Sequence, residues 1–237
     1  MIIACWSGPR NLSTACMYAF GARSDFTVCD EPFYAAYLAV TGLQHPMRDA
    51  ILATGETDAD LVARACATPP PKGHCYQKHM SQHMVEGFDR SWFAAASHVF
   101  LIRHPVRVLA SYAAKREAPT LDDIGFLQQA EIFNQVRDAG LPAFVIDSFD
   151  IRAATEPALE ALCAALGIAF EPSMLSWPPG GHDSDGVWAA HWYDAVHRST
   201  GFAGPEGALP DLPGSLQPVA QAAMPAYDML RRHRLRF

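Results

Sequence analysis

Residues 1–14, MIIACWSGPRNLST, carry the pattern that decides the fold of this chain. The first six are an apolar run typical of a buried strand, and Ser7, Gly8 and Pro9 then predict a turn. Residues 13–23, STACMYAFGAR, are small and apolar over about two turns, which predicts a helix that stops at Gly21. The chain is therefore expected to open with a strand, a turn and a helix.

The alternation of strand and helix continues outward from this start. Short apolar runs predict further buried strands at 26–29, at 75–77 with Lys78 at its exit, at 97–102 and at 143–146. Apolar residues at helical spacing lie at 106–113, at 126–136 and at 155–166 with Thr155 as its cap, and a weaker pattern covers 49–67. This alternation favours an α/β fold with a mostly parallel sheet flanked by helices, whose ligands bind at the carboxyl ends of the strands.

Length and composition fit one globular domain. The chain has 237 residues, 50% hydrophobic and 18% charged, so it can bury a large core, and disordered and fibrous classes are excluded. We expect residues 1–237 to form a single domain.

No apolar run approaches the ~20 residues of a membrane span, and the start lacks the basic and apolar regions of a signal peptide. We therefore expect a cytoplasmic protein without a membrane partner.

Charge and cysteine usage exclude two further classes. The net charge is −7 although four arginines crowd the last seven residues, so the body of the chain is more acidic still. A nucleic-acid partner is not expected, and an anionic ligand must be held by a few focused cations. The six cysteines include no CxxC pair and predict neither disulfides nor a zinc site.

One segment differs in composition from the rest of the chain. Residues 178–214 hold five prolines and seven glycines around the aromatic stretch GVWAAHWYDAVHRSTGF. Long unstructured loops are uncommon in compact domains, so we interpret this segment as a functional cover in preference to a disordered excursion. Within it, His182, Asp183 and Asp185 are interpreted as turn residues in preference to metal ligands.

The first candidate binding element is the turn at residues 7–14, SGPRNLST. A turn between a strand and a helix points backbone N–H groups and the helix N-terminus at one place, which suits an anion. Arg10 adds a guanidinium group, and Ser13 and Thr14 add hydroxyls. The spacing of a Walker A loop is absent. The alternative is an ordinary strand-to-helix turn with a surface arginine.

The second candidate element follows the strand at 97–102. Arg103 stands at its carboxyl end, and Ser111 lies off the apolar stripe of the next helix, so both can face the same crevice. A guanidinium and a hydroxyl there suit a second phosphate group. The alternative is that Arg103, His104 and Pro105 are only a charged helix start.

Together the two elements resemble the sulfotransferases that use 3′-phosphoadenosine 5′-phosphosulfate. In that family a P-[KR]-x-x-x-T turn binds the 5′-phosphosulfate, and an R-x7-S element binds the 3′-phosphate. The first is similar to Pro9, Arg10, Asn11, Leu12, Ser13 and Thr14, and the second to Arg103 and Ser111. Leu12 stands where the family often has glycine. The resemblance implies a P-loop nucleotide-binding, sulfotransferase-like fold with this phosphosulfate as co-substrate.

The resemblance also implies candidates for proton transfer, because the acceptor must lose a proton as it attacks sulfur. Glu31 resembles an acidic residue that some bacterial sulfotransferases place after the second strand. Lys78 resembles the family lysine that contacts the sulfuryl group. His79 and His83 resemble the family base without its spacing of two residues from the lysine. Which of Glu31, His79 and His83 is the base stays open.

The expected function is therefore the transfer of a sulfuryl group to a hydroxyl or amine of a small acceptor. His191, His197 and Arg198 are candidates to close over the nucleotide, and the alternative for them is a packed loop with a surface arginine. A sulfuryl group carries less charge than a phosphoryl group, so no metal ion is expected. Two alternatives stay open. One is a P-loop phosphotransferase that uses a nucleoside triphosphate, and the other is a non-catalytic nucleotide-binding protein of this fold.

Overall fold

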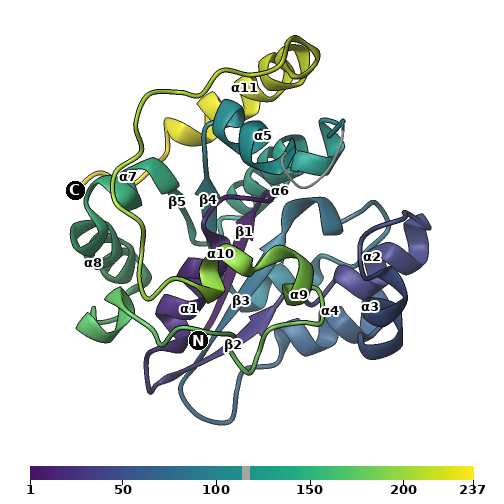
Figure 1. Ribbon diagram of the computed structural model, residues 1–237. Coiled ribbons are helices and arrows are strands. Elements are labelled where there is room, and N and C mark those ends of the chain that lie inside the picture. The colour runs from purple at the N-terminus through teal and green to yellow at the C-terminus, as the bar shows by residue number, and fades with distance from the viewer. Residues whose placement is uncertain (114–117) are drawn as a thin grey trace.

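The computed structural model of the protein describes residues 1–113 and 118–237. Within these residues the chain forms a sheet of five parallel strands in the order β2-β3-β1-β4-β5 (Figure 1). The strands are β1 (Ile2–Ser7), β2 (Phe26–Asp30), β3 (His74–Met80), β4 (Ser97–Ile102) and β5 (Ala143–Asp147). The predicted α/β fold with a mostly parallel sheet is confirmed.

The strand sequences explain why the sheet is buried. A parallel sheet covered on both faces is made of nearly continuous apolar runs, and every residue of β1 is buried. Successive side chains alternate, so Trp6 packs on one face and Cys5 on the other. Ser7 pairs with Met80 of β3 and with Leu101 of β4. The carboxyl ends of these three strands therefore lie side by side.

Helices cover both faces of the sheet. The face that holds Trp6 packs against α4 (Ala59–Ala67), α5 (Pro105–Ala113), α6 (Phe126–Asp138) and α11 (Gln217–Arg231). The face that holds Cys5 packs against α1 (Ser13–Gly21), α7 (Ser148–Ala153) and α8 (Thr155–Leu166). A third apolar cluster joins α2 (Tyr34–Thr41) and α3 (Arg48–Thr54) to α9 (Ala189–Trp192). Short 3₁₀ turns lie at Ser81–His83, Ser91–Ala95, Asp122–Ile124, Pro172–Leu175 and Gly214–Leu216.

The structure corrects three predicted elements. β3 extends to Met80, so Lys78 lies inside the strand and not at its exit. The helical pattern at 49–67 forms two helices, because the backbone becomes extended at Gly55. Only glycine fits closely at this position, since a Cβ there would press on the Ala35 side chain. Thr155 begins α8 but does not cap it, since its hydroxyl donates back to Ile151 O.

The 178–214 segment contains α9 and α10 (Asp194–His197). These two short helices, green in the middle of Figure 1, cross in front of the sheet. Tyr193, between them, reaches Lys78 of β3, so the segment lies against the carboxyl end of the sheet. In the part of the chain that is described, none of the helices combines the length and the apolar character that a membrane crossing requires.

Candidate functional site

A cavity of about 280 Å³ opens at the carboxyl ends of the strands. Its wall combines the turn after β1, the end of β3, the arginine after β4 and the segment that carries α9 and α10. The predicted site residues that line it are Pro9, Arg10, Asn11, Leu12, Ser13, Thr14, Glu31, Lys78, His83, Arg103 and Ser111. The structure thus brings both predicted anion elements to one place, and leaves His79 and Arg198 outside it.

The turn after β1 has an unusual backbone. Gly8 lies so close to the backbone of Ile124, in the 3₁₀ turn at Asp122–Ile124, that a Cβ at Gly8 would clash with the Ile124 carbonyl oxygen. Arg10 and Leu12 have φ angles of 60° and 67°, in the left-handed region. Leu12 therefore adopts the conformation for which glycine is better suited, at a cost of about 1–2 kcal/mol.

The N-terminus of α1 faces the cavity. Ser13, Thr14 and Ala15 line the cavity, and the N-cap residue Leu12 has no side-chain hydrogen bond to the first turn. The first N–H groups of a helix lack partners within the helix and carry partial positive charge. Asn11 fixes the turn, because its Nδ2 donates to a carbonyl oxygen of β4 at 3.2 Å. These features form the geometry of an anion cradle.

The two predicted anion elements touch each other. Arg10 Nε donates to Ser111 Oγ at 2.9 Å, and Arg103 Nη1 donates to Arg10 O at 2.6 Å. Burial, together with the charge of Arg103, lowers the pKa of Arg10, although a guanidinium group remains cationic. Two cations and a hydroxyl therefore converge beside the start of α1.

Arg103 also contacts an acidic residue that the sequence analysis did not single out. Arg103 Nε donates to Glu206 Oε1 at 3.0 Å, and Nη2 pairs with the same oxygen. Glu206 belongs to the 178–214 segment, whose proline and glycine content gives no local sign of an ion pair. Every nitrogen of the Arg103 guanidinium thus has a partner from the protein.

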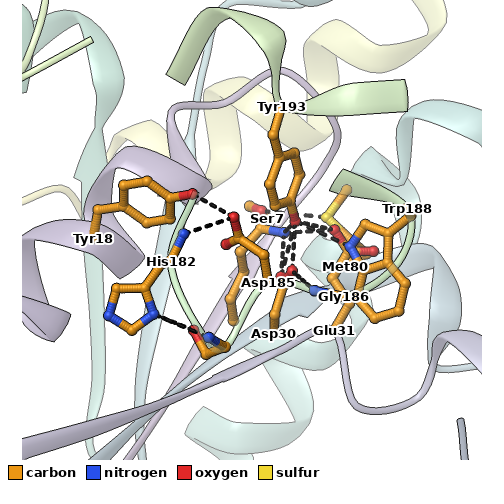
Figure 2. Close-up of polar contacts among 12 residues, drawn as sticks. Ser7, Tyr18, Asp30, Glu31, Met80, His182, Asp185, Gly186, Trp188 and Tyr193 are labelled. Carbon is orange, nitrogen blue, oxygen red and sulfur yellow. Dashed lines mark hydrogen bonds and ion pairs between the residues drawn. The ribbon is translucent and has the colours of Figure 1, made fainter. Parts of the chain in front are cut away.

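Lys78 lies in a buried polar cluster beside the cavity. Its side chain is 1% exposed. Nζ donates to Asp30 Oδ1 at 2.8 Å, to Glu31 Oε1 at 2.5 Å and to the Tyr193 hydroxyl at 2.5 Å. The Tyr193 hydroxyl points at Asp30 and donates to it, and it accepts from Trp188 Nε1 at 3.1 Å (Figure 2). An ammonium group has three protons, so these partners use all of them.

The cluster shifts the pKa values of its members. Burial raises the pKa of Glu31 above its ordinary value, because the nearby Lys78 ammonium only partly offsets the loss of water. Burial alone would lower the pKa of Lys78, but the charges of Asp30 and Glu31 outweigh it and raise that pKa. Lys78 therefore stays charged, while Glu31 holds a proton more readily than an exposed glutamate does.

His83 lies next to this cluster and lines the cavity. Its ring stacks on Tyr34 and Tyr37, with centroids 4.4 Å and 4.7 Å away. Its Nδ1 lies 3.9 Å from Glu31 Oε2 and has no hydrogen-bond partner among the described residues. Burial lowers the pKa of His83 well below its ordinary value, so the ring is neutral at pH 7. A neutral histidine thus stands beside a carboxyl group at the wall of the cavity.

The structure argues against His79 as a base. Side chains alternate along β3, so His79 faces the opposite side of the sheet from Lys78. It is 2% exposed and stacks on Trp6 with ring centroids 4.6 Å apart. Its Nε2 lies 3.1 Å from Gln77 Oε1, and burial lowers its pKa to about 3. A base must reach the acceptor, and His79 belongs to the core on the other face.

The 178–214 segment agrees with one prediction and departs from another. His182, Asp183 and Asp185 lie in a turn, as predicted, because Asp185 N donates to His182 O at 2.9 Å. His191, His197 and Arg198 do not line the cavity, and Arg198 is exposed. Asp185, predicted as a turn residue, accepts from the Tyr18 hydroxyl at 2.5 Å and from His182 N at 3.0 Å, and pairs with His197 (Figure 2). The segment is thereby attached to α1. Its residues that do line the cavity include Trp192, Tyr193 and Phe202, which only the aromatic composition indicated.

Over residues 1–113 and 118–237, no three His, Cys, Asp or Glu side chains are arranged to hold a metal ion. The expectation that catalysis needs no metal stays a prediction.

Comparison with known proteins gives a family, two relatives and a fold. The family described as a sulfotransferase domain matches residues 1–234. Two proteins of Arabidopsis thaliana, named branched-chain-amino-acid aminotransferase-like proteins 1 and 2, are 36% and 34% identical over 98% of this chain, which spans 42% of their length. The solved sulfotransferase domain from the curacin biosynthetic pathway aligns over 94% of this chain and 97% of its own, with a TM-score of 0.53 and 15% identity. That likeness shows the fold.

Proposed function

Since this chain belongs to the sulfotransferase domain family, we propose that it is an enzyme that transfers a sulfuryl group from 3′-phosphoadenosine 5′-phosphosulfate to a small acceptor. The acceptor carries a hydroxyl or an amine. The family and the fold support the class of reaction, and the geometry of the cavity supports this donor.

The observation that carries the proposal is the contact between the two anion elements. In the proposed complex, the start of α1 with Ser13 and Thr14 holds the 5′-phosphosulfate, and Arg103 and Ser111 hold the 3′-phosphate. Arg10 joins the two, because it bonds both Ser111 and Arg103. A nucleotide with two separate anionic groups satisfies both elements at once. A nucleoside triphosphate has its anionic groups in one row and suits only the turn.

The proposed reaction needs a proton acceptor and a stabilised leaving group. The acceptor's oxygen or nitrogen attacks sulfur and loses its proton, while the bond between sulfur and the bridging oxygen breaks. That oxygen keeps the electron pair and leaves as part of adenosine 3′,5′-bisphosphate. Arg10 is the cation that we assign to the charge developing there. Lys78, predicted for the same task, must first give up one of its three partners.

We assign Glu31 as the proton acceptor. It lines the cavity, and its raised pKa makes the ionised carboxylate a stronger base than an exposed glutamate. His83 Nδ1 lies 3.9 Å from its second carboxylate oxygen, too far for a hydrogen bond, so His83 borders that oxygen without holding it. Lys78 and Tyr193 hold the first oxygen, so Glu31 presents one free oxygen.

Calorimetry tests the donor. We expect adenosine 3′,5′-bisphosphate to bind in the presence of a chelator, and more tightly than ATP with magnesium. Arg103→Ala should weaken this binding by on the order of 1.5–3 kcal/mol, because it removes charge-assisted hydrogen bonds to the 3′-phosphate. Arg64→Ala, which removes an exposed arginine on α4, serves as the matched control and should leave it unchanged. Tighter binding of ATP with magnesium would contradict the proposed donor.

A screen of small alcohols, phenols and amines with labelled donor then tests turnover. Transfer of label to any of them supports an enzyme. Binding of the bisphosphate with no transfer across the screen favours the alternative of a non-catalytic nucleotide-binding protein.

A further inference from the structure

Three arginines surround the carboxylate of Glu206. Oε1 pairs with Arg103 and, at 3.0 Å, with Arg152 Nη1, while Oε2 lies 2.9 Å from Arg107 Nε. The Glu206 side chain is 1% exposed. One carboxylate therefore lies buried among three guanidinium groups. In the described part of the chain it is the only carboxylate that pairs with them, so their combined charge is there only partly neutralised.

The three arginines lie on or directly after elements of the α/β domain outside the 178–214 segment, whereas Glu206 belongs to that segment. Arg103 follows β4, Arg107 lies in α5 and Arg152 lies in α7. Arg107 and Arg152 also donate to carbonyl oxygens of the cover, those of Gly207 and Gly204. Arg103, Arg107 and Arg152 thus form a strongly cationic site at the edge of the cavity. Residues 204–207 of the 178–214 segment fill it.

This arrangement conflicts with immediate binding of a phosphate at Arg103. The Nε and Nη2 atoms of Arg103 form the edge that would pair with two phosphate oxygens, and both are taken by Glu206. A 3′-phosphate can use this edge only after Glu206 has left. A phosphate dianion also matches three guanidinium groups better than a single carboxylate does, in both charge and number of oxygens.

We propose that Glu206 is an internal placeholder for the 3′-phosphate of the donor, and that donor binding displaces residues 204–207 from the three arginines. This inference rests on the proposed function, because it assumes the bisphosphate nucleotide as ligand. A competitor within the chain lowers the apparent affinity by the fraction of molecules in which the site is free. Glu206 therefore sets how strongly the protein discriminates between nucleotides with and without a 3′-phosphate.

The test compares two nucleotides on three proteins by calorimetry. The nucleotides are adenosine 3′,5′-bisphosphate and adenosine 5′-monophosphate, which lacks the 3′-phosphate. The proteins are the unaltered chain, Glu206→Gln and the control Asp211→Asn, which removes an exposed acid of the same segment. We expect Glu206→Gln to bind the bisphosphate about tenfold more tightly. Its affinity for the monophosphate, and both affinities of the control, should stay unchanged.

Hydrogen exchange of the unaltered chain gives an independent measurement if Glu206→Gln does not fold. The amides of Gly204, Glu206 and Gly207 should exchange faster when the bisphosphate is bound, and unchanged or slower exchange overturns the placeholder. If the unaltered chain binds the bisphosphate but Glu206→Gln binds it equally or less well, the placeholder is overturned and the proposed donor stands. If neither protein binds the bisphosphate, the proposed donor is overturned and the placeholder with it.

Discussion

Lys78 is a cation whose hydrogen bonds are all used by its own neighbours. Asp30, Glu31 and Tyr193 surround its Nζ inside the protein. Such a cluster adds little net stability compared with apolar packing, but removal of one partner leaves uncompensated buried charge. Lys78 thus fixes one carboxylate oxygen of Glu31 at the cavity, a positioning role that the sequence resemblance did not imply.

Lys78→Met should therefore destabilise the fold more than it changes donor binding. We expect the free energy of unfolding to fall by about 3–5 kcal/mol, because two carboxylates lose their cation. Urea denaturation measures this change. Tyr193→Phe removes one hydroxyl from the same cluster and should cost only about 1–3 kcal/mol. If Lys78→Met costs less than Tyr193→Phe, the cluster does not depend on the ammonium group.

Sequence spacing predicted those site residues that lie on turns directly after strands. Arg10 and Arg103 follow β1 and β4, and a parallel sheet brings such turns to the same edge. His79 was misplaced because a shift of one position along a strand reverses the face. Glu206 had no signal at all, since its partner Arg103 is 103 residues away and its own surroundings have the composition of a loop.

At the scale of elements, the sequence predicted α5, α6 and α8, whose apolar residues recur at helical spacing, and missed α2 and α11. α2 is buried at five consecutive positions, 34–38, so it shows no alternation of apolar and polar faces. α11 contains Pro225 in its interior and a second proline near its start, which both resemble helix breakers. β1 and β4 were found because burial on both faces of the sheet leaves an apolar run in their sequences.

The turn after β1 allows a prediction at this scale. In Gly8→Ala the new Cβ would meet the backbone oxygen of Ile124, which no side-chain rotation can relieve. We expect a loss of about 1–3 kcal/mol in the free energy of unfolding. Weaker binding of adenosine 3′,5′-bisphosphate should accompany it, because the turn moves. Gly214→Ala places a Cβ in open space and should change neither denaturation nor calorimetry. Unchanged stability of Gly8→Ala would show that the turn relaxes freely.

At the scale of the whole molecule, burial keeps three histidines neutral. Burial lowers the pKa of His79 to about 3, that of His98 to about 4 and that of His83 well below its ordinary value. In the unfolded chain these groups take up a proton near pH 6.5. Between that pH and the lowered folded values, the unfolded state binds more protons, so stability falls as the pH falls.

The contribution of one such histidine can be measured as a difference between two variants in how steeply the free energy of unfolding changes with pH. Each should contribute about 1.4 kcal/mol per pH unit to the free energy of unfolding below pH 6. His79→Gln should remove that contribution between pH 6 and pH 4, as followed by urea denaturation at several pH values. Burial raises the pKa values of Glu31 and Asp147, which makes stability rise as the pH falls and so opposes the effect of the histidines. This opposing effect is the same in every variant and cancels when their slopes are compared. The exposed His233→Gln should keep the slope of the unaltered chain. Equal slopes for the two variants would mean that His79 is protonated in the folded state.

The 178–214 segment is attached in two chemically different ways. On one side Asp185 accepts from Tyr18, and Gly186 N donates to Asp30 at 3.3 Å. On the other side Glu206 pairs with arginines. With Glu206 as the placeholder, the first attachment keeps the carboxylate near the site after displacement, at an effective concentration in the millimolar range. Because the donor and the spent nucleotide of the proposed reaction carry the same 3′-phosphate, the carboxylate competes with both for the arginines and weakens the binding of both by the same factor.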